Sequence, residues 1–110
     1  MKGADKFFFM LNLFGSLKPY NTLNNREKQV FAELMYYNEQ LKDLDERKRN
    51  VLIFDYDTRQ EIANKYDLSI ASVYNIMSSL KKKGFLGKSY LVDRYLFKDE
   101  EQIIIQFNGK

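Results

Sequence analysis

Residues 57–86, DTRQEIANKYDLSIASVYNIMSSLKKKGFL, constrain the fold more than any other stretch, because hydrophobic residues recur there at helical spacing on both sides of a short break. Thr58 and Glu61 have the spacing of a capping box and predict the start of a first helix. Ser69 is the expected N-cap of a second helix, and Gly84 is expected to end it. The side chains that we expect to be buried are Ile62, Ala63 and Tyr66 in the first helix, Leu68 in the turn, and Val73, Ile76, Met77 and Leu80 in the second. The stretch therefore predicts two short helices, a tight turn between them, and the start of a strand.

The apolar spacing from Ile62 to Ile76 resembles the helix-turn-helix of DNA-binding proteins. Asp67 stands where that family usually has glycine, and aspartate tolerates the left-handed backbone conformation better than most residues do. The run Lys83-Gly84-Phe85-Leu86 is similar to the exit from a winged-helix recognition helix into its wing. The resemblance extends over about the last 85 residues.

Two further segments resemble members of this family. LNNREKQVFAEL is similar to the start of the helix before the helix-turn-helix in sigma-factor-like regulators, and the Tyr-Leu-Val…Tyr-Leu-Phe-Lys run is similar to the wing of some phage and plasmid winged-helix proteins. The resemblance implies a mainly α winged helix-turn-helix fold, with three or four helices and a two- or three-stranded antiparallel sheet.

Residues 1–23 form an apolar N-terminal arm, which we separate from the winged helix-turn-helix domain expected over residues 24–110. The aromatic run Phe7-Phe8-Phe9 dominates the arm, and its apolar stretch is shorter than the roughly 20 residues that span a bilayer. No small-residue cleavage pattern follows it, so we expect no membrane segment and a cytoplasmic protein. The arm can cover the domain's own core, pair with another copy or dock on a partner protein. We expect self-packing or dimerisation, because so many aromatic side chains are unfavourable in water.

Residues 24–42 predict a long amphipathic helix. Asn24 is the expected N-cap, and Glu27 stands at the capping-box position. The expected buried stripe is Val30, Leu34, Tyr37 and Leu41, widened by Phe31 and Met35.

The next segment begins with a charged run, in which Asp45 is expected to cap a short helix that inserts Leu52 and Phe54 into the core. Asp55 and Asp57 flank a tyrosine, and such a pair of carboxylates can hold a divalent metal. Because no third carboxylate accompanies them, we interpret Asp57 as a helix cap and Asp55 as a turn residue, and predict no metal site.

The C-terminal part of the chain predicts β structure. Ile103, Ile105 and Phe107 alternate with other residues as in a strand. Residues 90–92 are its expected partner, residues 98–101 the connecting turn, and Phe85-Leu86 the start of a preceding strand.

The composition favours a non-enzymatic protein without a cofactor. The chain has no histidine, the commonest general base, and no cysteine, and it contains no glycine-rich phosphate loop. The net charge of +3 is unevenly distributed: residues 26–61 carry seven basic and nine acidic side chains, but residues 65–98 carry seven basic and only two acidic ones. A polyanion would require this basic excess on the second helix and the wing, although a solvated lysine cluster at a helix end gives the same pattern.

The candidate site follows from helical geometry, because the buried stripe of the second helix leaves its opposite face exposed. The side chains expected to contact DNA bases are Ser69, Ile70, Ala71, Tyr74, Asn75 and Ser78. The side chains expected to contact DNA phosphates are Arg59, Lys65, Lys81, Lys82, Lys88 and Arg94. No arginine lies on the expected groove face, so we expect tight binding to require a dimer or a partner.

The resulting hypothesis is sequence-specific binding of double-stranded DNA, in transcriptional regulation or sigma-like promoter recognition, in the cytoplasm of a bacterium or a phage-infected cell. The alternative is a winged helix that serves protein contact, for example in a phage packaging complex, a virion or a transcription complex. Either function accommodates a homodimer or a larger complex formed through the N-terminal arm.

Overall fold

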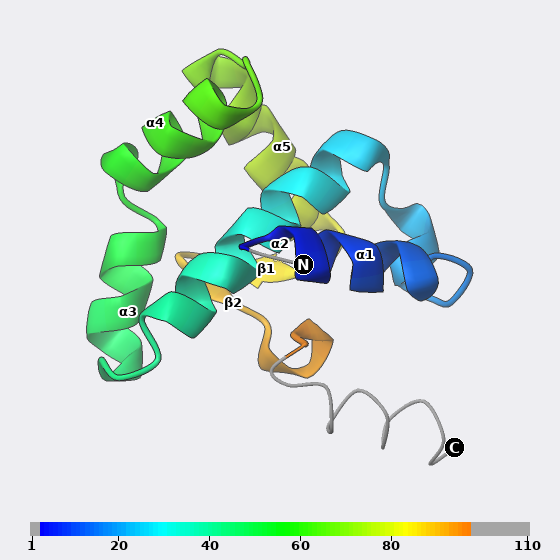
Figure 1. Ribbon diagram of the computed structural model, residues 1–110, viewed down its shortest axis with the longest axis horizontal. Helices are drawn as coiled ribbons and strands as arrows, with labels where there is room; N and C mark the ends of the chain where they lie inside the picture. Colours follow the sequence, from blue (N-terminus) through cyan, green and yellow to red (C-terminus); the bar gives the residue numbers. More distant parts are fainter. Residues whose placement is uncertain (1–2, 98–110) are drawn as a thin grey trace.

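The computed structural model describes residues 3–97 of the 110-residue chain, and over that range it is mainly helical with one small antiparallel sheet (Figure 1). The elements are α1 (Asp5–Leu13), η1 (Tyr20–Thr22), α2 (Asn25–Gln40), α3 (Glu46–Ile53), α4 (Tyr56–Lys65), α5 (Ile70–Lys82), β1 (Leu86–Gly87), β2 (Tyr90–Leu91) and η2 (Asp93–Tyr95). The described range contains five α-helices where three or four were expected, because the N-terminal arm forms a helix of its own. The strand expected over residues 103–107 lies outside the described residues.

Helix α2 runs through the centre of the molecule (Figure 1). Residues 30–35 are all buried, so this helix is enclosed on every side rather than on one stripe. It contacts α1, α3 and α5. The predicted capping box is confirmed: the Asn24 side chain accepts a hydrogen bond from the backbone N–H of Glu27, and the Glu27 carboxylate accepts one from the backbone N–H of Asn24, both at 2.9 Å.

The N-terminal arm is packed against the domain. Phe7 and Leu11 of α1, with Phe14 after it, are buried in the same core as α2. Self-packing is therefore what the structure shows for one face of the arm, while Phe9 and Leu13 on the other face are exposed.

An aromatic cluster ties the two ends of the described chain together. Tyr20 and Phe14 each stack on Phe97, with ring centroids 5.6 and 5.4 Å apart. The Tyr20 hydroxyl donates a hydrogen bond to the backbone oxygen of Tyr95 at 3.2 Å. Burial, together with the nearby Tyr95, raises the pKa of Tyr20 to about 12.

The start of α4 differs from the prediction. Asp55, expected in a turn, is the N-cap, and its carboxylate accepts a hydrogen bond from the backbone N–H of Thr58 at 2.9 Å. Asp57, expected to be the cap, is instead an exposed residue of the first turn. Thr58 is the third residue inside α4 and so cannot be its N-cap, and its buried hydroxyl donates to the backbone oxygen of Leu52 at 2.7 Å.

The predicted role of Glu61 is also wrong. Its carboxylate accepts a hydrogen bond from the hydroxyl of Tyr37 on α2 instead of reaching back to the helix start. Burial, with the Glu61 carboxylate close by, raises the pKa of Tyr37.

Helix α3 has the predicted cap but a different buried side. The carboxylate of Asp45 accepts a hydrogen bond from the backbone N–H of Lys48, which confirms the cap. Ile53 enters the core instead of Leu52, which is 41% exposed, and Phe54 is half-buried. The rotation of this two-turn helix about its own axis decides which side chain faces the core. A charged segment with one apolar run does not specify that rotation.

The turn between α4 and α5 is tight and contains one residue in the left-handed conformation. Asp67 has a φ of +54°, the left-handed conformation that glycine would adopt most easily. The backbone N–H of Leu68 donates to the oxygen of Ala63 at 2.8 Å and closes the end of α4. The Ser69 side chain then accepts a hydrogen bond from the N–H of Ser72 at 3.0 Å, which confirms the predicted cap of α5.

Helix α5 ends at the predicted glycine. Gly84 has a φ of +92°, and the N–H of Phe85 donates to the oxygen of Leu80 at 3.0 Å. Three of the predicted apolar residues of α5 are buried and Ile76 is half-buried. Phe85 is fully buried, so the chain enters the hairpin from an anchored position.

The sheet is a short hairpin in which Leu86 pairs with Leu91 and Gly87 with Tyr90. Residues 90–91 therefore pair with residues 86–87; the pairing expected with residues 103–107 lies outside the described range. A Cβ atom on Gly87 would lie 2.0 Å from the Tyr90 ring, so the ring can cross this strand only where the residue is glycine.

Candidate functional site

The outer face of α5 carries the residues expected to contact bases. Ala71, Tyr74, Asn75 and Ser78 are exposed on it, because Val73, Met77 and Leu80 occupy the opposite face. Ile70 is half-buried at the start of the helix.

Ser69 is exposed, but its hydroxyl is engaged within the chain. Its oxygen accepts a hydrogen bond from the backbone N–H of Ser72, and its O–H donates to the Ser72 hydroxyl oxygen at 2.9 Å. Its capping role therefore competes with any contact to a ligand.

Arg59 lies beneath Tyr74 and links α4 to the outer face of α5. Its guanidinium carbon is 4.3 Å from the centre of the Tyr74 ring, and its Nη1 donates to the backbone oxygen of Phe54 at 2.5 Å. The Nε of Arg59 is buried without a hydrogen-bond partner. Arg59, which was expected to contact a DNA phosphate, is therefore already in contact with Tyr74 and with the backbone before α4.

Lys65 is exposed, but its charge is paired with a buried carboxylate of the same chain. Its Nζ lies 2.5 Å from the carboxylate of Glu33, a buried residue of α2. Tyr66 donates to the same carboxylate at 2.6 Å, and burial together with the Glu33 charge raises the pKa of Tyr66. Lys65 thus links the end of α4 to α2 and does not line the hollow beside α5 described below.

Three lysines expected at phosphates are exposed: Lys81 and Lys82 at the end of α5, and Lys88 in the hairpin loop. None of the three forms an ion pair in the described part of the chain. Arg94 is exposed on η2, where its guanidinium lies 5.0 Å from the centre of the Tyr95 ring.

A shallow hollow of about 180 Å³ lies between α5 and the hairpin. It brings together five of the predicted site residues: Arg59, Tyr74, Ser78, Lys81 and Lys88. Asn75 and Lys82 are exposed on the same helix but do not line the hollow, and Lys65 and Arg94 lie elsewhere. The sequence alone could place α5 residues on one face, but the hairpin reaches that face only through the tertiary fold.

A carboxylate that sequence reasoning treated only as part of a cap fixes the end of α5. Glu27 lies 2.7 Å from the Nζ of Lys83 and also accepts a hydrogen bond from the Ser79 hydroxyl. Burial by itself would raise the pKa of Glu27, but the hydrogen bonds from Lys83, Ser79 and the backbone of Asn24 outweigh it and lower the pKa. Lys83 is therefore a structural lysine, unlike Lys81 and Lys82, which precede it.

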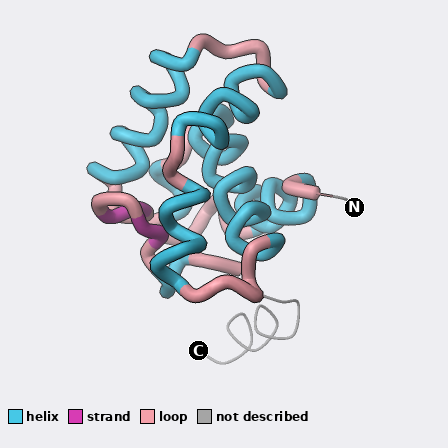
Figure 2. Tube along the Cα trace, turned by 90° about the vertical axis from the view of Figure 1, so that its left-hand side faces the viewer, coloured by secondary structure: helices cyan, strands magenta, loops and turns pink. Residues whose placement is uncertain are grey.

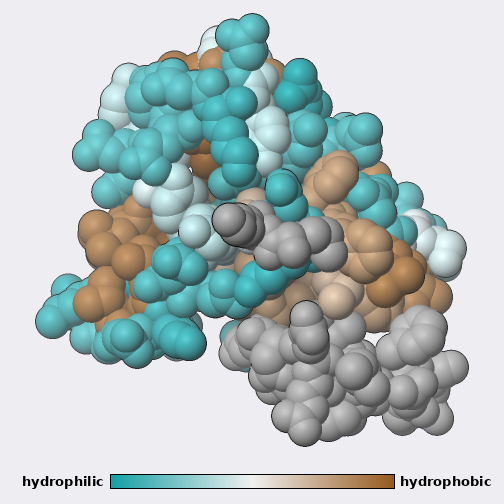
Figure 3. All heavy atoms as spheres, viewed as in Figure 1, coloured by the Kyte–Doolittle hydropathy of each residue, from teal (hydrophilic) through white to brown (hydrophobic). Residues whose placement is uncertain are grey.

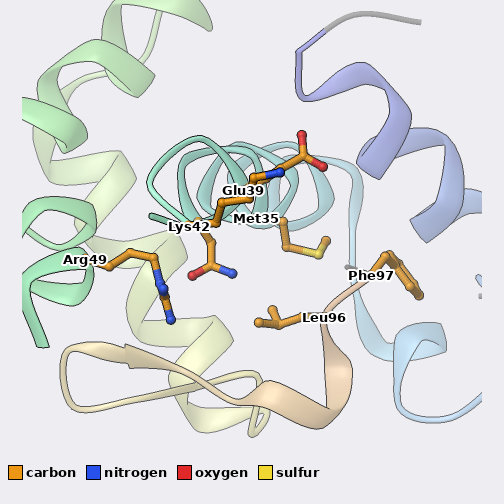
Figure 4. Close-up of a pocket in the computed structure, with 7 residues that line it drawn as sticks. Met35, Glu39, Lys42, Arg49, Leu96 and Phe97 are labelled. Atoms are coloured by element: carbon orange, nitrogen blue, oxygen red, sulfur yellow. The ribbon is translucent and has the colours of Figure 1, made fainter. Parts of the chain in front are cut away.

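A second cavity, of about 260 Å³, lies below the C-terminal half of α2 (Figure 4). Met35 and Leu96 form an apolar part of its wall, and the charged residues that line the cavity are Glu39, Lys42 and Arg49. Glu39 is already paired with Lys6 at 2.7 Å, and Arg49 donates to the backbone oxygen of Leu44 at 3.1 Å. Glu39 thus links α1 to α2, and Arg49 bonds the loop before its own helix, while its Nε is buried without a hydrogen-bond partner.

Within residues 3–97, no group of three or more acidic, histidine or cysteine side chains is arranged to hold a metal ion. Over the same range, every helix is too short or too polar to cross a membrane. In comparisons with protein-family models, curated proteins and solved structures, none matches this chain.

Proposed function

We propose that this chain is a winged helix-turn-helix protein that binds double-stranded DNA, in which α4 and α5 form the helix-turn-helix and the β1–β2 hairpin is a short wing. The observation that best supports the proposal is the meeting of the outer face of α5 with the hairpin around one lysine-bearing hollow. The proposed role is transcriptional regulation or sigma-like promoter recognition.

The proposed base contacts use the exposed side chains of α5. A major groove about 12 Å wide admits a helix, and an asparagine amide can pair with adenine through two hydrogen bonds. Asn75 is exposed near the middle of α5 and is our candidate for that contact. Ala71 and Ile70 can contact a thymine methyl group, and Ser78 can donate to or accept from a base edge. This set favours a site that contains A·T pairs.

The proposed phosphate contacts come from Lys81, Lys82 and Lys88. Lysine charges on the two sides of the hollow can contact the DNA phosphates that border the major groove. Such contacts position the protein on the duplex but do not read the base sequence. Each neutralised phosphate changes the slope of log affinity against log salt by about −0.9. Because the proposed interface supplies only these three lysines for phosphates, a single copy is expected to bind DNA modestly.

The test is a titration of fluorescent A·T-containing duplexes at several salt concentrations. Reversing both charges in Lys81→Glu/Lys82→Glu is expected to weaken binding to every duplex and to reduce the salt slope by about 2. Asn75→Ala is expected to keep the salt slope and lose discrimination at one base pair, at a cost of about 1–3 kcal/mol.

The matched control is Arg47→Glu/Lys48→Glu, which makes the same change in charge at two exposed residues of α3. It is expected to leave binding nearly unchanged. Absence of measurable binding at low salt contradicts the proposal, as does an equal loss in the control.

The second candidate function is a protein-interaction or assembly module, for example in a phage packaging complex, a virion or a transcription complex. The observation that favours it is the exposure of large apolar side chains outside the hollow, including Phe9 and Leu13 on α1 and Val51 on α3. Isolation of a stable ring or a large complex together with no DNA binding would select this function.

A further inference from the structure

Helix α1 presents an apolar stripe on the side facing away from the core. Phe9 is 48% exposed, Leu13 is 56% exposed, and Leu17, just after the helix, is 49% exposed. Phe9 and Leu13 are one helical turn apart in α1, so they share one face, and Leu17 lies in the turn that follows the helix. Figure 3 shows hydrophobic surface gathered over this part of the molecule and a second hydrophobic area over α3. Three large side chains so placed form a patch that a protein surface normally covers.

We propose that this stripe is the contact by which two copies of the chain form a dimer, with their α1 helices antiparallel about a twofold axis. In such a contact, the same patch is used by both copies. An axis that passes between the turns of Phe9 and Leu13 places Phe9 of each copy against Leu13 of the other. This pairing of Phe9 with Leu13 depends only on their one-turn spacing within α1, so it requires no rearrangement of the fold.

Charge complementarity supports a second copy as the occupant. Asp5, the first residue of α1, lies one turn before Phe9, and Lys18 follows Leu17 in the turn after the helix, so opposite charges precede and follow the stripe along the chain. In the antiparallel arrangement, the Asp5 end of α1 in each copy lies on the same side as the Lys18 end of α1 in the other, so these opposite charges can approach one another. Both side chains are exposed, and neither forms an ion pair among the described residues of one chain.

The position of the stripe leaves the hollow uncovered. Helix α1 lies on the opposite side of the molecule from the hairpin, as seen in Figure 2. The dimer contact therefore does not use the lysines proposed to contact DNA. It also does not rest on the proposed function, because it is measured with no DNA present.

The experiment is sedimentation equilibrium of the full chain from about 1 μM to 1 mM, a range that spans weak to moderate self-association. The unmodified chain is expected to convert from monomer to dimer within this range. Phe9→Glu and Leu13→Glu are each expected to weaken dimerisation at least tenfold, while circular dichroism verifies that the helices remain. The matched control is Val51→Glu, at a residue that is 64% exposed on α3, and it is expected to dimerise like the unmodified chain.

A charge exchange tests the antiparallel arrangement. Asp5→Lys and Lys18→Glu are each expected to weaken the dimer, and the double variant is expected to restore it because the opposite charges again face one another. A monomer at every concentration overturns the proposal. Dissociation by Val51→Glu but not by Phe9→Glu overturns it in favour of the α3 surface, and failure of the double variant to restore the dimer overturns the antiparallel arrangement.

Discussion

At the scale of single residues, the stability of the candidate site depends on buried carboxylates of α2. Glu27 holds the end of α5 through Lys83 and Ser79, and Glu33 holds the end of α4 through Lys65 and Tyr66. The two glutamates are nearly two turns apart on one helix and are both buried. A buried carboxylate requires such partners, because an unpaired one would lose its hydration without compensation. The relative position of α4 and α5 is therefore set partly by charge pairing to the helix behind them.

Glu27 gives a prediction about pH. Its pKa in the folded chain is lowered from 4.5, so its stabilisation is fully present above pH 4.5 and is lost as the pH falls through the folded-state pKa. Glu27→Gln is expected to lower the free energy of unfolding at pH 7 by about 1–3 kcal/mol and to reduce the loss of stability on acidification. Urea unfolding between pH 3 and pH 7 measures both effects. Asp43→Asn, at an exposed carboxylate, is the control; an equal effect there would show that Glu27 has no special role.

At the scale of elements, the helix ends are fixed by individual polar residues and by two left-handed positions. Asn24, Asp45, Asp55 and Ser69 each accept a backbone hydrogen bond at the start of a helix. Such a cap contributes about 1 kcal/mol. The turn between α4 and α5 is the one that orients the candidate site, and it depends on the left-handed conformation of Asp67.

The turn gives a prediction about side chains at position 67. Asp67→Gly is expected to keep or raise stability, because glycine adopts a positive φ without steric cost. Asp67→Ala is expected to lower the free energy of unfolding by about 1 kcal/mol, since a Cβ disfavours this conformation and alanine lacks the local hydrogen bonding of aspartate. Thermal or urea unfolding of the two variants measures the difference. Equal stability of the glycine and alanine variants would contradict the role assigned to this backbone conformation.

At the scale of the whole molecule, the N-terminal arm is part of the core that supports α5. Helix α1 covers one side of α2 while α5 contacts another, and the rings of Phe14 and Phe97 stack across nearly the whole described length of the chain. The arm and the α4–α5 segment therefore stabilise each other through α2.

This packing gives a prediction about the arm. Leu11 is fully buried, and Leu11→Ala is expected to destabilise the whole chain by about 2–5 kcal/mol because it leaves a cavity against α2. Val51→Ala, at an exposed residue of α3, is expected to change stability by less than about 0.5 kcal/mol. Unfolding followed by circular dichroism measures both variants. A small effect of Leu11→Ala would show that α1 is not part of the cooperative core.

The sequence by itself determined the features that depend on residues within about one helical turn of one another. These include the capping box at Asn24, the caps at Asp45 and Ser69, the stop at Gly84 and the outward face of α5, because backbone hydrogen bonds and helical periodicity are local. For α4 the sequence favoured Thr58 or Asp57 as the cap, and only the structure showed that Asp55 has this role, with Thr58 inside the helix and donating to the backbone oxygen of Leu52.

Only the tertiary structure decided which charged residues are free for a partner. Lys65 and Lys83 resemble Lys81 and Lys82 in the sequence, yet they are paired with buried glutamates that lie 32 and 56 residues away. Such pairing depends on how the helices cross, and no local pattern encodes that crossing. The same reason applies to the hollow between α5 and the hairpin and to the burial of one face of α1, since each depends on segments that meet only after the chain has folded around α2.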